Sequence, residues 1–201
     1  MKESLSLALK YTKDKKAIVI GASTGGPKAL VYLISNLPER ISLPIFVVQH
    51  MPKGFTASFA ERLDKESKVM VVEAEDKMPI VKGTVYIAPG DYHMELEDNM
   101  IRLNKKAKIF GVRPAVDYLF ISAAEAYGRN LLGIILTGMG KDGAAGMLKI
   151  KEKGGYNIAQ DMESSVVYGM PGHAINQNAV HQVLSLENIS TVINYCVRVK
   201  E

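Results

Sequence analysis

The 201-residue sequence contains one cysteine, no tryptophan and no long apolar run. A single cysteine, Cys196, cannot form a disulfide within the chain, which is typical of proteins in a reducing compartment. The longest apolar stretches, such as residues 133–136 and 45–48, are far shorter than the roughly 18 residues that a membrane-spanning helix needs. The first residues lack the apolar core and the cleavage site of a secretion signal. We therefore predict a cytoplasmic protein that does not insert into a membrane.

Repeats and strong compositional bias are also absent. The 17 glycines follow no collagen-like period, and no repeat of about 20 to 50 residues is found, so fibres and solenoids are not expected. Hydrophobic residues make up 47% and charged residues 23% of the chain, which is ordinary for a globular protein. This length suits one sizeable domain better than two.

The net charge of +4 lies mostly at the amino-terminal end of the sequence. Residues 1–16 contain five lysines against one glutamate and one aspartate, a net charge of +3, whereas residues 17–201 contain 20 bases and 19 acids, a net charge of +1. A nearly neutral domain is a poor candidate for wrapping nucleic acid, and we predict no nucleic-acid partner. We interpret residues 1–16 as a linker remnant or a frayed helix, followed by one domain over residues 17–201.

A second basic segment lies in the middle of the chain. It contains five bases and no acid within twelve residues: Arg102, Lys105, Lys106, Lys108 and Arg113. The segment is either a solvated loop or a docking patch for an acidic partner, and the sequence leaves both interpretations open.

From Ala17 onwards, short apolar runs alternate with helical patterns. We expect strands at residues 17–20, 45–48, 69–73, 84–88 and 132–136, with 156–159 as the last strand. We expect helices at residues 27–36, 56–65, 114–127, 144–153, 171–178 and 189–197. Runs at 93–96 and 100–103 flank Glu97-Asp98-Asn99, which is typical of an antiparallel hairpin. The alternation predicts an α/β fold with a doubly wound, mostly parallel sheet flanked by helices, and an antiparallel β-hairpin.

The loop after the first strand carries a candidate nucleophile. Its sequence, Gly21-Ala-Ser-Thr-Gly-Gly-Pro27, satisfies the G-x-S-x-G pattern, in which small neighbours allow a sharp turn that exposes the hydroxyl of Ser23. The helix that follows offers free N–H groups to a developing oxyanion. The alternative is a phosphate-binding turn, although the G-x-G-x-x-G spacing and the P-loop Lys-Ser/Thr pair are both missing.

The loop after the second strand carries a candidate base, His50, within Gln49-His-Met-Pro52. A strand end in the ligand crevice can hold an imidazole beside a serine. A lone histidine is more often structural, and His93, at another strand end, is a competing base. The remaining two, His173 and His181, fall in helical or loop segments, and the four histidines show no zinc-site spacing, so we expect no metal and no cofactor.

A third loop, Thr137-Gly-Met-Gly-Lys-Asp-Gly143, opens a helix. Asp142 can accept a hydrogen bond from the histidine, fix its tautomer and stabilise the imidazolium. The alternative role of Asp142 is that of a helix N-cap. A serine, a histidine and an aspartate at three strand ends suggest a hydrolase, but the chain order Ser-His-Asp differs from the Ser-Asp-His order of α/β-hydrolases.

These loops resemble the active-site segments of the chemotaxis methylesterase family, CheB. The resemblance extends to Gly54–Leu63, Gly83–Asp91, Arg113–Asp117 and the stretch from Gln160 to Pro171, in the order of the family, from about residue 17 to about residue 183. It implies a protein-glutamate methylesterase that releases methanol from methylated glutamates of chemoreceptors and can also deamidate receptor glutamines.

The resemblance also implies roles for individual residues. Ser23 would be the nucleophile, His50 the base and Asp142 its orienting partner, while the Thr24 side chain and the Met139 backbone N–H would stabilise the oxyanion. Members of the family carry an amino-terminal receiver domain, for which this chain has no room, so an excised catalytic domain is expected. Two alternatives stay open: a non-catalytic nucleotide- or phosphate-binding module, and an enzyme that acts mainly as a deamidase.

Overall fold

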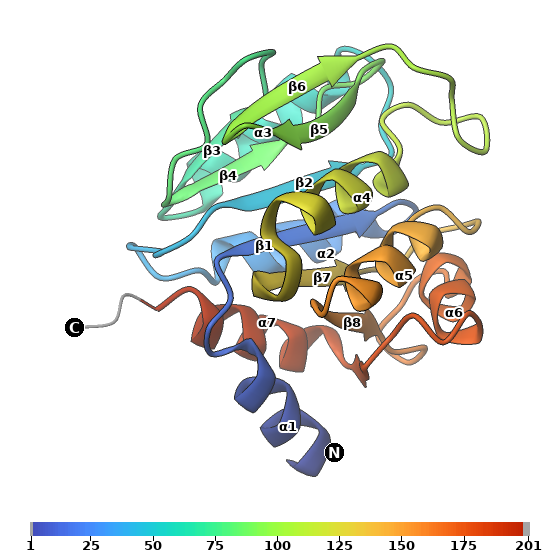
Figure 1. Cartoon of the computed structure of the whole chain (residues 1–201). Coiled ribbons are helices and arrows are strands. Elements are labelled where there is room, and N and C mark those ends of the chain that lie inside the picture. Colours follow the sequence, from blue (N-terminus) through green and yellow to red (C-terminus); the bar gives the residue numbers. More distant parts are fainter. Residues whose placement is uncertain (1, 199–201) are drawn as a thin grey trace.

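A seven-stranded parallel sheet forms the middle layer of the computed structural model, which describes residues 2–198. Its strands are β1 (Ala17–Ala22), β2 (Ile45–Gln49), β3 (Met70–Glu73), β4 (Thr84–Ile87), β7 (Leu131–Ile135), β8 (Tyr156–Gln160) and β9 (Gln182–Leu184), in the order β3-β4-β2-β1-β7-β8-β9. The strands β5 (His93–Glu97) and β6 (Met100–Asn104) form a separate antiparallel hairpin above β4 in Figure 1. The predicted fold class is therefore confirmed.

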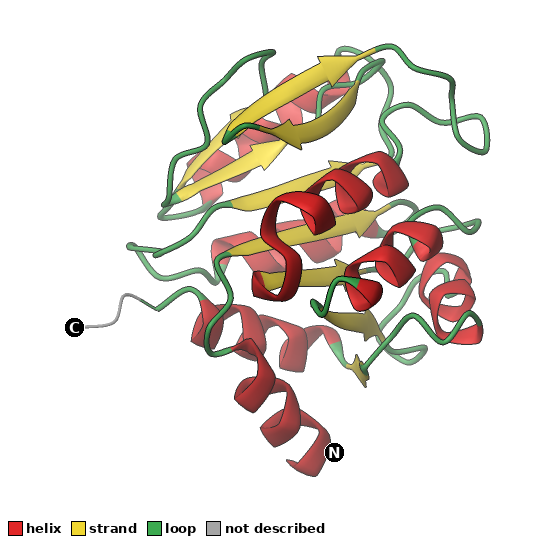
Figure 2. Ribbon diagram, in the orientation of Figure 1, coloured by secondary structure: helices red, strands yellow, loops and turns green. Residues whose placement is uncertain are grey.

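Helices cover both faces of the sheet, as the red ribbons on either side of the yellow strands show in Figure 2. They are α1 (Lys2–Thr12), α2 (Gly26–Ser35), α3 (Phe55–Glu66), α4 (Val116–Tyr127), α5 (Ala144–Glu152), α6 (Gly169–Asn176) and α7 (Leu186–Cys196), with a short 3₁₀ turn at Gly128–Asn130. None of the helices within residues 2–198 is long and apolar enough to cross a membrane.

The apolar side chains form one core on each face of the sheet. Because side chains alternate along a strand, Ile18 and Ile20 of β1 belong to the core under α2, α3 and α7, whereas Val19 belongs to the core under α4 and α5. All six residues of β1 are buried, as expected for a strand covered on both faces. The central strands are therefore held rigidly, and the loops at their ends start from fixed positions.

The order of the strands fixes where a ligand crevice can form. The chain passes from β1 to β2 on one side and later returns to β7 on the other side, so the direction of winding changes between β1 and β7. Ligands of doubly wound sheets bind outside the carboxyl ends of the strands at such a switch point. The three loops with candidate residues follow β1, β2 and β7, and all three lie at this edge, on the right in Figure 1.

The structure also corrects one sequence expectation and adds to another. Residues 156–159 are not the last strand, because β9 pairs in parallel with β8 and closes the edge of the sheet. This strand has three residues, is only partly buried and carries no apolar run that could signal it.

Most of residues 1–16 form α1, which buries Ala8 and Thr12 and packs against α7 and β9. Their assignment to a linker remnant remains a prediction.

Candidate active site

Ser23 lies in the turn that joins β1 to α2, directly above the end of the sheet. A hydrogen bond of 2.8 Å from the Gly26 N–H to the Ser23 carbonyl closes the turn, and one of 3.0 Å from the Ser23 N–H to the Thr137 carbonyl joins it to the segment after β7. Gly25 has φ 83°, the left-handed conformation that glycine adopts without strain, so the turn can be this tight. A methyl group on Gly138 would lie 2.8 Å from the Ser23 Cβ, which shows how closely the loop after β7 approaches the serine.

His50 and Asp142 are in direct contact. The imidazole Nε2 lies 2.7 Å from Asp142 Oδ2, and the two side chains are 11% and 3% exposed. The backbone N–H of His50 donates to the carbonyl of Ala22, the residue before Ser23, at 3.0 Å. If Nε2–H donates to the carboxylate, Nδ1 keeps its lone pair and is the ring nitrogen that can accept a proton from a serine hydroxyl.

Asp142 also caps a helix, but not the helix that it precedes. Its carboxylate accepts hydrogen bonds from the N–H groups of Val116 at 2.6 Å and Asp117 at 3.0 Å, in the first turn of α4. The helix after Asp142 begins beyond Gly143, which is in the left-handed conformation. Three donors therefore orient this carboxylate, and the helix-capping and histidine-orienting interpretations of Asp142 are compatible.

Asp117, in the first turn of α4, makes a similar hydrogen bond to the first turn of α5. Its Oδ1 accepts a hydrogen bond of 2.8 Å from the N–H of Gly146 in the first turn of α5. Burial, reinforced by the neighbouring charge of Asp142, raises the pKa of Asp117 to about 6. The first turn of α4 is thus bonded by a carboxylate from the loop before α5, and the first turn of α5 by a carboxylate from α4, and this arrangement fixes the loop that carries Asp142.

Gln49 joins the serine loop to the histidine. The side chain is 2% exposed, and its Nε2 donates to the carbonyls of Ser23 and His50 at 3.0 Å each. Neither Gln49 nor Asp117 was assigned a role from the sequence. The sequence signal for Gln49 was a polar residue at the end of an apolar strand. The signal for Asp117 was a polar residue on the apolar face of a predicted amphipathic helix.

His93 has a structural environment that contrasts with that of His50. Its ring is fully buried, with Nδ1 accepting from the Ala115 N–H and Nε2 bonded to the Ala107 carbonyl, both at 3.1 Å. Burial lowers the pKa of His93, so the neutral form is favoured. Because both ring nitrogens are engaged, His93 is less suited than His50 to act as a base.

Thr24 and Met139 lie on the exposed rim of the site, and the Met139 side chain is 73% exposed. Within the described part of the chain, neither the Thr24 hydroxyl nor the Met139 N–H makes a hydrogen bond, so both donors are available to a ligand. The threonine carbonyl instead accepts a hydrogen bond of 2.9 Å from the hydroxyl of Thr137, which anchors the backbone of the rim.

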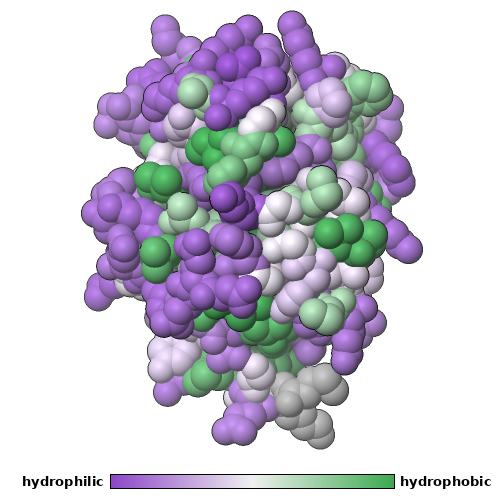
Figure 3. All heavy atoms as spheres, turned by 90° about the vertical axis from the view of Figure 1, so that its right-hand side faces the viewer, coloured by the Kyte–Doolittle hydropathy of each residue, from purple (hydrophilic) through white to green (hydrophobic). Residues whose placement is uncertain are grey.

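The surface at this edge combines basic and apolar side chains. A pocket of about 300 Å³ beside His50 is lined partly by Lys108 and Arg113. Figure 3 views this edge, where hydrophobic residues form separate spots among hydrophilic ones. Large exposed apolar residues at this edge include Phe55 at the start of α3 and, in loops, Phe110, Met139, Met162 and Val166. The edge therefore offers apolar contacts around a polar centre.

The basic segment over residues 102–113 is largely neutralised by acids of the hairpin region. Four of its five bases form ion pairs: Arg102 with Glu97, Lys106 with Glu95, and both Lys105 and Arg113 with Asp91. The fifth, Lys108, is exposed. Among residues 2–198, no three His, Cys, Asp or Glu side chains come together as a metal site would require.

Comparison with known proteins gives matches over nearly the whole chain. A family model described as CheB methylesterase matches residues 18–193. A protein-glutamate methylesterase/protein-glutamine glutaminase of Pyrococcus horikoshii is 48% identical over 187 residues, which cover 91% of this chain and 51% of the relative. A relative with the same name in Clostridium acetobutylicum is 48% identical over 184 residues, which cover 91% of this chain and 53% of the relative. The chain thus spans about half the length of these curated relatives.

A solved structure matches the fold. The crystal structure of the Thermotoga maritima CheB methylesterase catalytic domain is similar with a TM-score of 0.87 and 46% sequence identity. The match covers 91% of this chain and 99% of that chain.

Proposed function

Because the chain belongs to the CheB methylesterase family, we propose that it hydrolyses methyl esters of glutamate side chains in chemoreceptors by acyl transfer through Ser23. The observation that carries the proposal is the contact of 2.7 Å between His50 and Asp142 at the strand ends beside the Ser23 turn. A serine next to a histidine whose second nitrogen is held by a buried carboxylate is the arrangement that activates a hydroxyl for attack on a carbonyl.

In the proposed reaction, the Ser23 hydroxyl attacks the ester carbonyl while His50 Nδ1 takes its proton. The proton then passes to the methoxide as its bond to the carbonyl carbon breaks, so methanol departs and a glutamyl ester of Ser23 remains. Water attacks this ester with the same histidine as base, which releases the glutamate carboxylate and restores the serine. The Thr24 hydroxyl and the Met139 N–H, both available in the described structure, would stabilise the oxyanion in each step.

The same groups can hydrolyse a glutamine side chain, with ammonia as the leaving group in place of methanol. The names of the relatives, protein-glutamate methylesterase/protein-glutamine glutaminase, support this second reaction. A non-catalytic phosphate-binding module is disfavoured, because it would not require the buried pairing of His50 with Asp142.

The proposed partner is a cytoplasmic helix of a chemoreceptor, approached through the loops around His50. Because four of the five bases in the 102–113 segment form ion pairs with acids of the hairpin region, we infer that the contribution of this segment's charge to docking comes mainly from Lys108, which lines the pocket beside His50. A receiver domain is expected in longer family members, and the single cysteine favours a reaction in a reducing cytoplasm.

The test is release of methanol from membranes that carry methyl-labelled chemoreceptors. We expect Ser23→Ala to lower release by about 10³-fold or more. The matched control is Ser58→Ala, which removes an exposed hydroxyl bonded only within its own helix turn, to Phe55. Equal release by the wild type and a folded Ser23→Ala variant would refute the role of Ser23, and ammonia release from the same membranes measures the deamidase reaction separately.

A further inference from the structure

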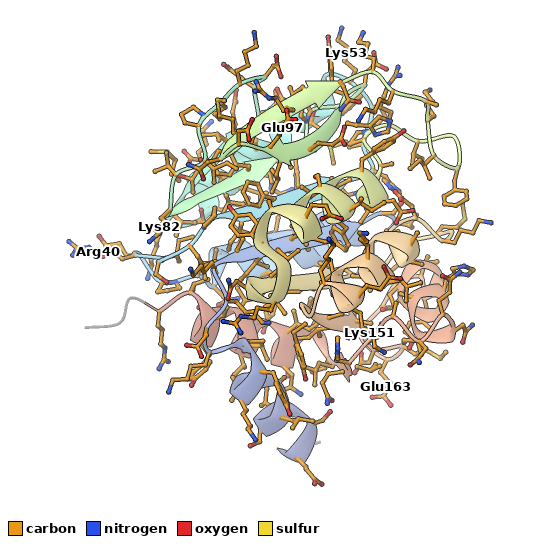
Figure 4. The ribbon with its side chains drawn as sticks, viewed as in Figure 1. Arg40, Lys53, Lys82, Glu97, Lys151 and Glu163 are labelled. Carbon is orange, nitrogen blue, oxygen red and sulfur yellow. The ribbon has the colours of Figure 1, made fainter. Side chains whose placement is uncertain are left out.

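A basic cavity lies at the edge of the sheet where the strands begin, opposite the candidate active site. It has a volume of about 920 Å³ and is lined by the segments that lead into β1, β2, β4 and β7 and by the end of α7. Its charged lining consists of one acid, Asp14, and six bases: Lys13, Lys15, Lys16, Lys82, Arg129 and Arg198. Figure 4 shows Lys82 at this edge, far from Lys53, which follows β2 at the other edge.

The bases of this cavity outnumber its one acid, Asp14, whose charge acts on Lys15. Over the described range 2–198, none of the six forms an ion pair with a carboxylate, whereas four of the five bases in the 102–113 segment do. Like charges gathered around one concave surface repel one another and raise the local potential. Six bases without an ion pair to a carboxylate in residues 2–198 therefore share one concave surface.

Hydrogen bonds among the lining segments hold the cavity in shape. Lys15 is partly buried, and its Nζ donates to the Arg129 carbonyl at 2.5 Å, which leaves further donors of the same ammonium free to bond. The Lys16 N–H bonds the Asn130 carbonyl at 2.7 Å, and the Ser42 N–H bonds the Val197 carbonyl at 2.8 Å. Burial lowers the pKa of Lys15, an effect that a bound anion would oppose.

We propose that this cavity binds a small soluble anion that carries two or more phosphate groups. Lysine ammonium and arginine guanidinium groups are the usual partners of phosphate oxygens, and several bases around one cavity favour a multiply charged ligand over a single ion. The volume lies in the range of small-molecule sites. Leu43, Pro44, Ile80 and Tyr127 add apolar walls that can contact an organic group attached to the phosphates.

The proposal concerns a site separate from the esterase. The cavity lies at the amino ends of β1, β2 and β7, whereas Ser23, His50 and Asp142 follow the carboxyl ends of the same strands. A strand of six residues such as β1 separates the two edges by roughly 17 Å. Binding can therefore be measured without reference to ester hydrolysis.

The experiment is a calorimetric titration of the chain with inorganic tripolyphosphate and, separately, with ATP. We expect saturable binding at one site, at least tenfold tighter than that of inorganic phosphate, and weakening at least threefold between about 50 and 200 mM NaCl. Equal affinities for tripolyphosphate and ATP would indicate that only the phosphate chain is recognised. Tighter binding of ATP would indicate that the apolar walls also contact the ligand. Both results support the proposal. Absence of saturable binding by either polyphosphate at millimolar concentration would overturn it.

Charge-reversed variants locate the site. Lys16→Glu, Lys82→Glu and Arg129→Glu combined should weaken polyphosphate binding at least 30-fold, an effect on the order of several lost charge contacts. The control, Lys28→Glu, Lys65→Glu and Lys68→Glu combined, changes the net charge equally at three exposed lysines outside the cavity lining. If the triple variant fails to fold, Lys16→Ala and Arg129→Ala test the same point singly. Equal binding by cavity and control variants would refute the site, while Ser23→Ala should bind as the wild type does.

Discussion

The most discriminating prediction concerns Asp142→Asn. In the structure, the carboxylate accepts three hydrogen bonds, from His50 Nε2 at 2.7 Å and from the N–H groups of Val116 and Asp117 at 2.6 and 3.0 Å. An amide of the same shape has one acceptor oxygen and a donor NH₂ group, so at least one of the three donors then faces another donor. The histidine also loses the charge that stabilises its protonated form in the reaction.

Two magnitudes follow from this geometry. Loss of tautomer control in a Ser-His-Asp arrangement lowers turnover by on the order of 10⁴-fold, and we expect a similar effect here. Loss of one buried hydrogen bond with an unpaired partner should lower the free energy of unfolding by about 1–3 kcal/mol. The variant should therefore remain folded while its activity nearly disappears. Methanol release and urea unfolding, measured on the same preparation, check the two expectations.

The matched control is Asp117→Asn, at the other carboxylate of the reciprocal cap. Asp117 bonds the Gly146 N–H, but no hydrogen bond to His50 is found for it within residues 2–198. If Asp142 served only to cap α4, the two asparagine variants would have similar activities. We expect Asp117→Asn to lose less than tenfold in methanol release. A loss below tenfold for a folded Asp142→Asn variant would refute the orienting role.

Three further predictions test the surroundings of the site. Gln49→Met removes the donors to the Ser23 and His50 carbonyls and should lower kcat by about 10- to 100-fold with little change in KM; an unchanged kcat would count against a positioning role. Because the pKa of Asp117 is raised to about 6 in the fold, the folded state holds the proton more tightly than the unfolded state, so this group's contribution to stability falls as pH rises from about 4 to 6. Relative to Asp117→Asn, the wild type should lose up to about 3 kcal/mol over this range in urea titrations, and parallel pH profiles would contradict the assignment. A methyl group on Gly26 would collide with the Gln49 side chain and lie 2.8 Å from the Ala22 Cβ, so Gly26→Ala should lower the melting temperature and the activity together.

Much of the fold is readable from periodicity because the central strands are buried on both faces. The apolar runs at 17–20 and 45–48 coincide with the cores of β1 and β2, and the hairpin turn at Asp98 and Asn99 has the positive φ values that such a turn requires. The edge strand β9 was missed because it has only three residues, of which Leu184 alone is buried, and they carry no such pattern. Its pairing depends on β8 lying beside it, which is a tertiary contact.

The sequence also placed Ser23, His50 and Asp142 in loops at three strand ends, since each of these loops directly follows an apolar run. It could not show that Asp142 caps α4 rather than α5, because the N–H groups that it accepts belong to a helix more than twenty residues earlier in the chain. For the same reason, the roles that we infer for Gln49 and Asp117 had no local signal beyond a polar residue in an apolar setting.

The distribution of charge shows most clearly which properties the sequence determines and which the tertiary structure determines. The sequence by itself determined how many bases each segment carries, and it indicated two basic segments, at residues 1–16 and 102–113. Only the tertiary structure decided their different surroundings, because acids of the hairpin region fold against the second segment while Lys82, Arg129 and Arg198 gather around the end of the first. Electrostatic energy depends on distance in space, and distance in space is set by the packing of the sheet rather than by neighbours along the chain.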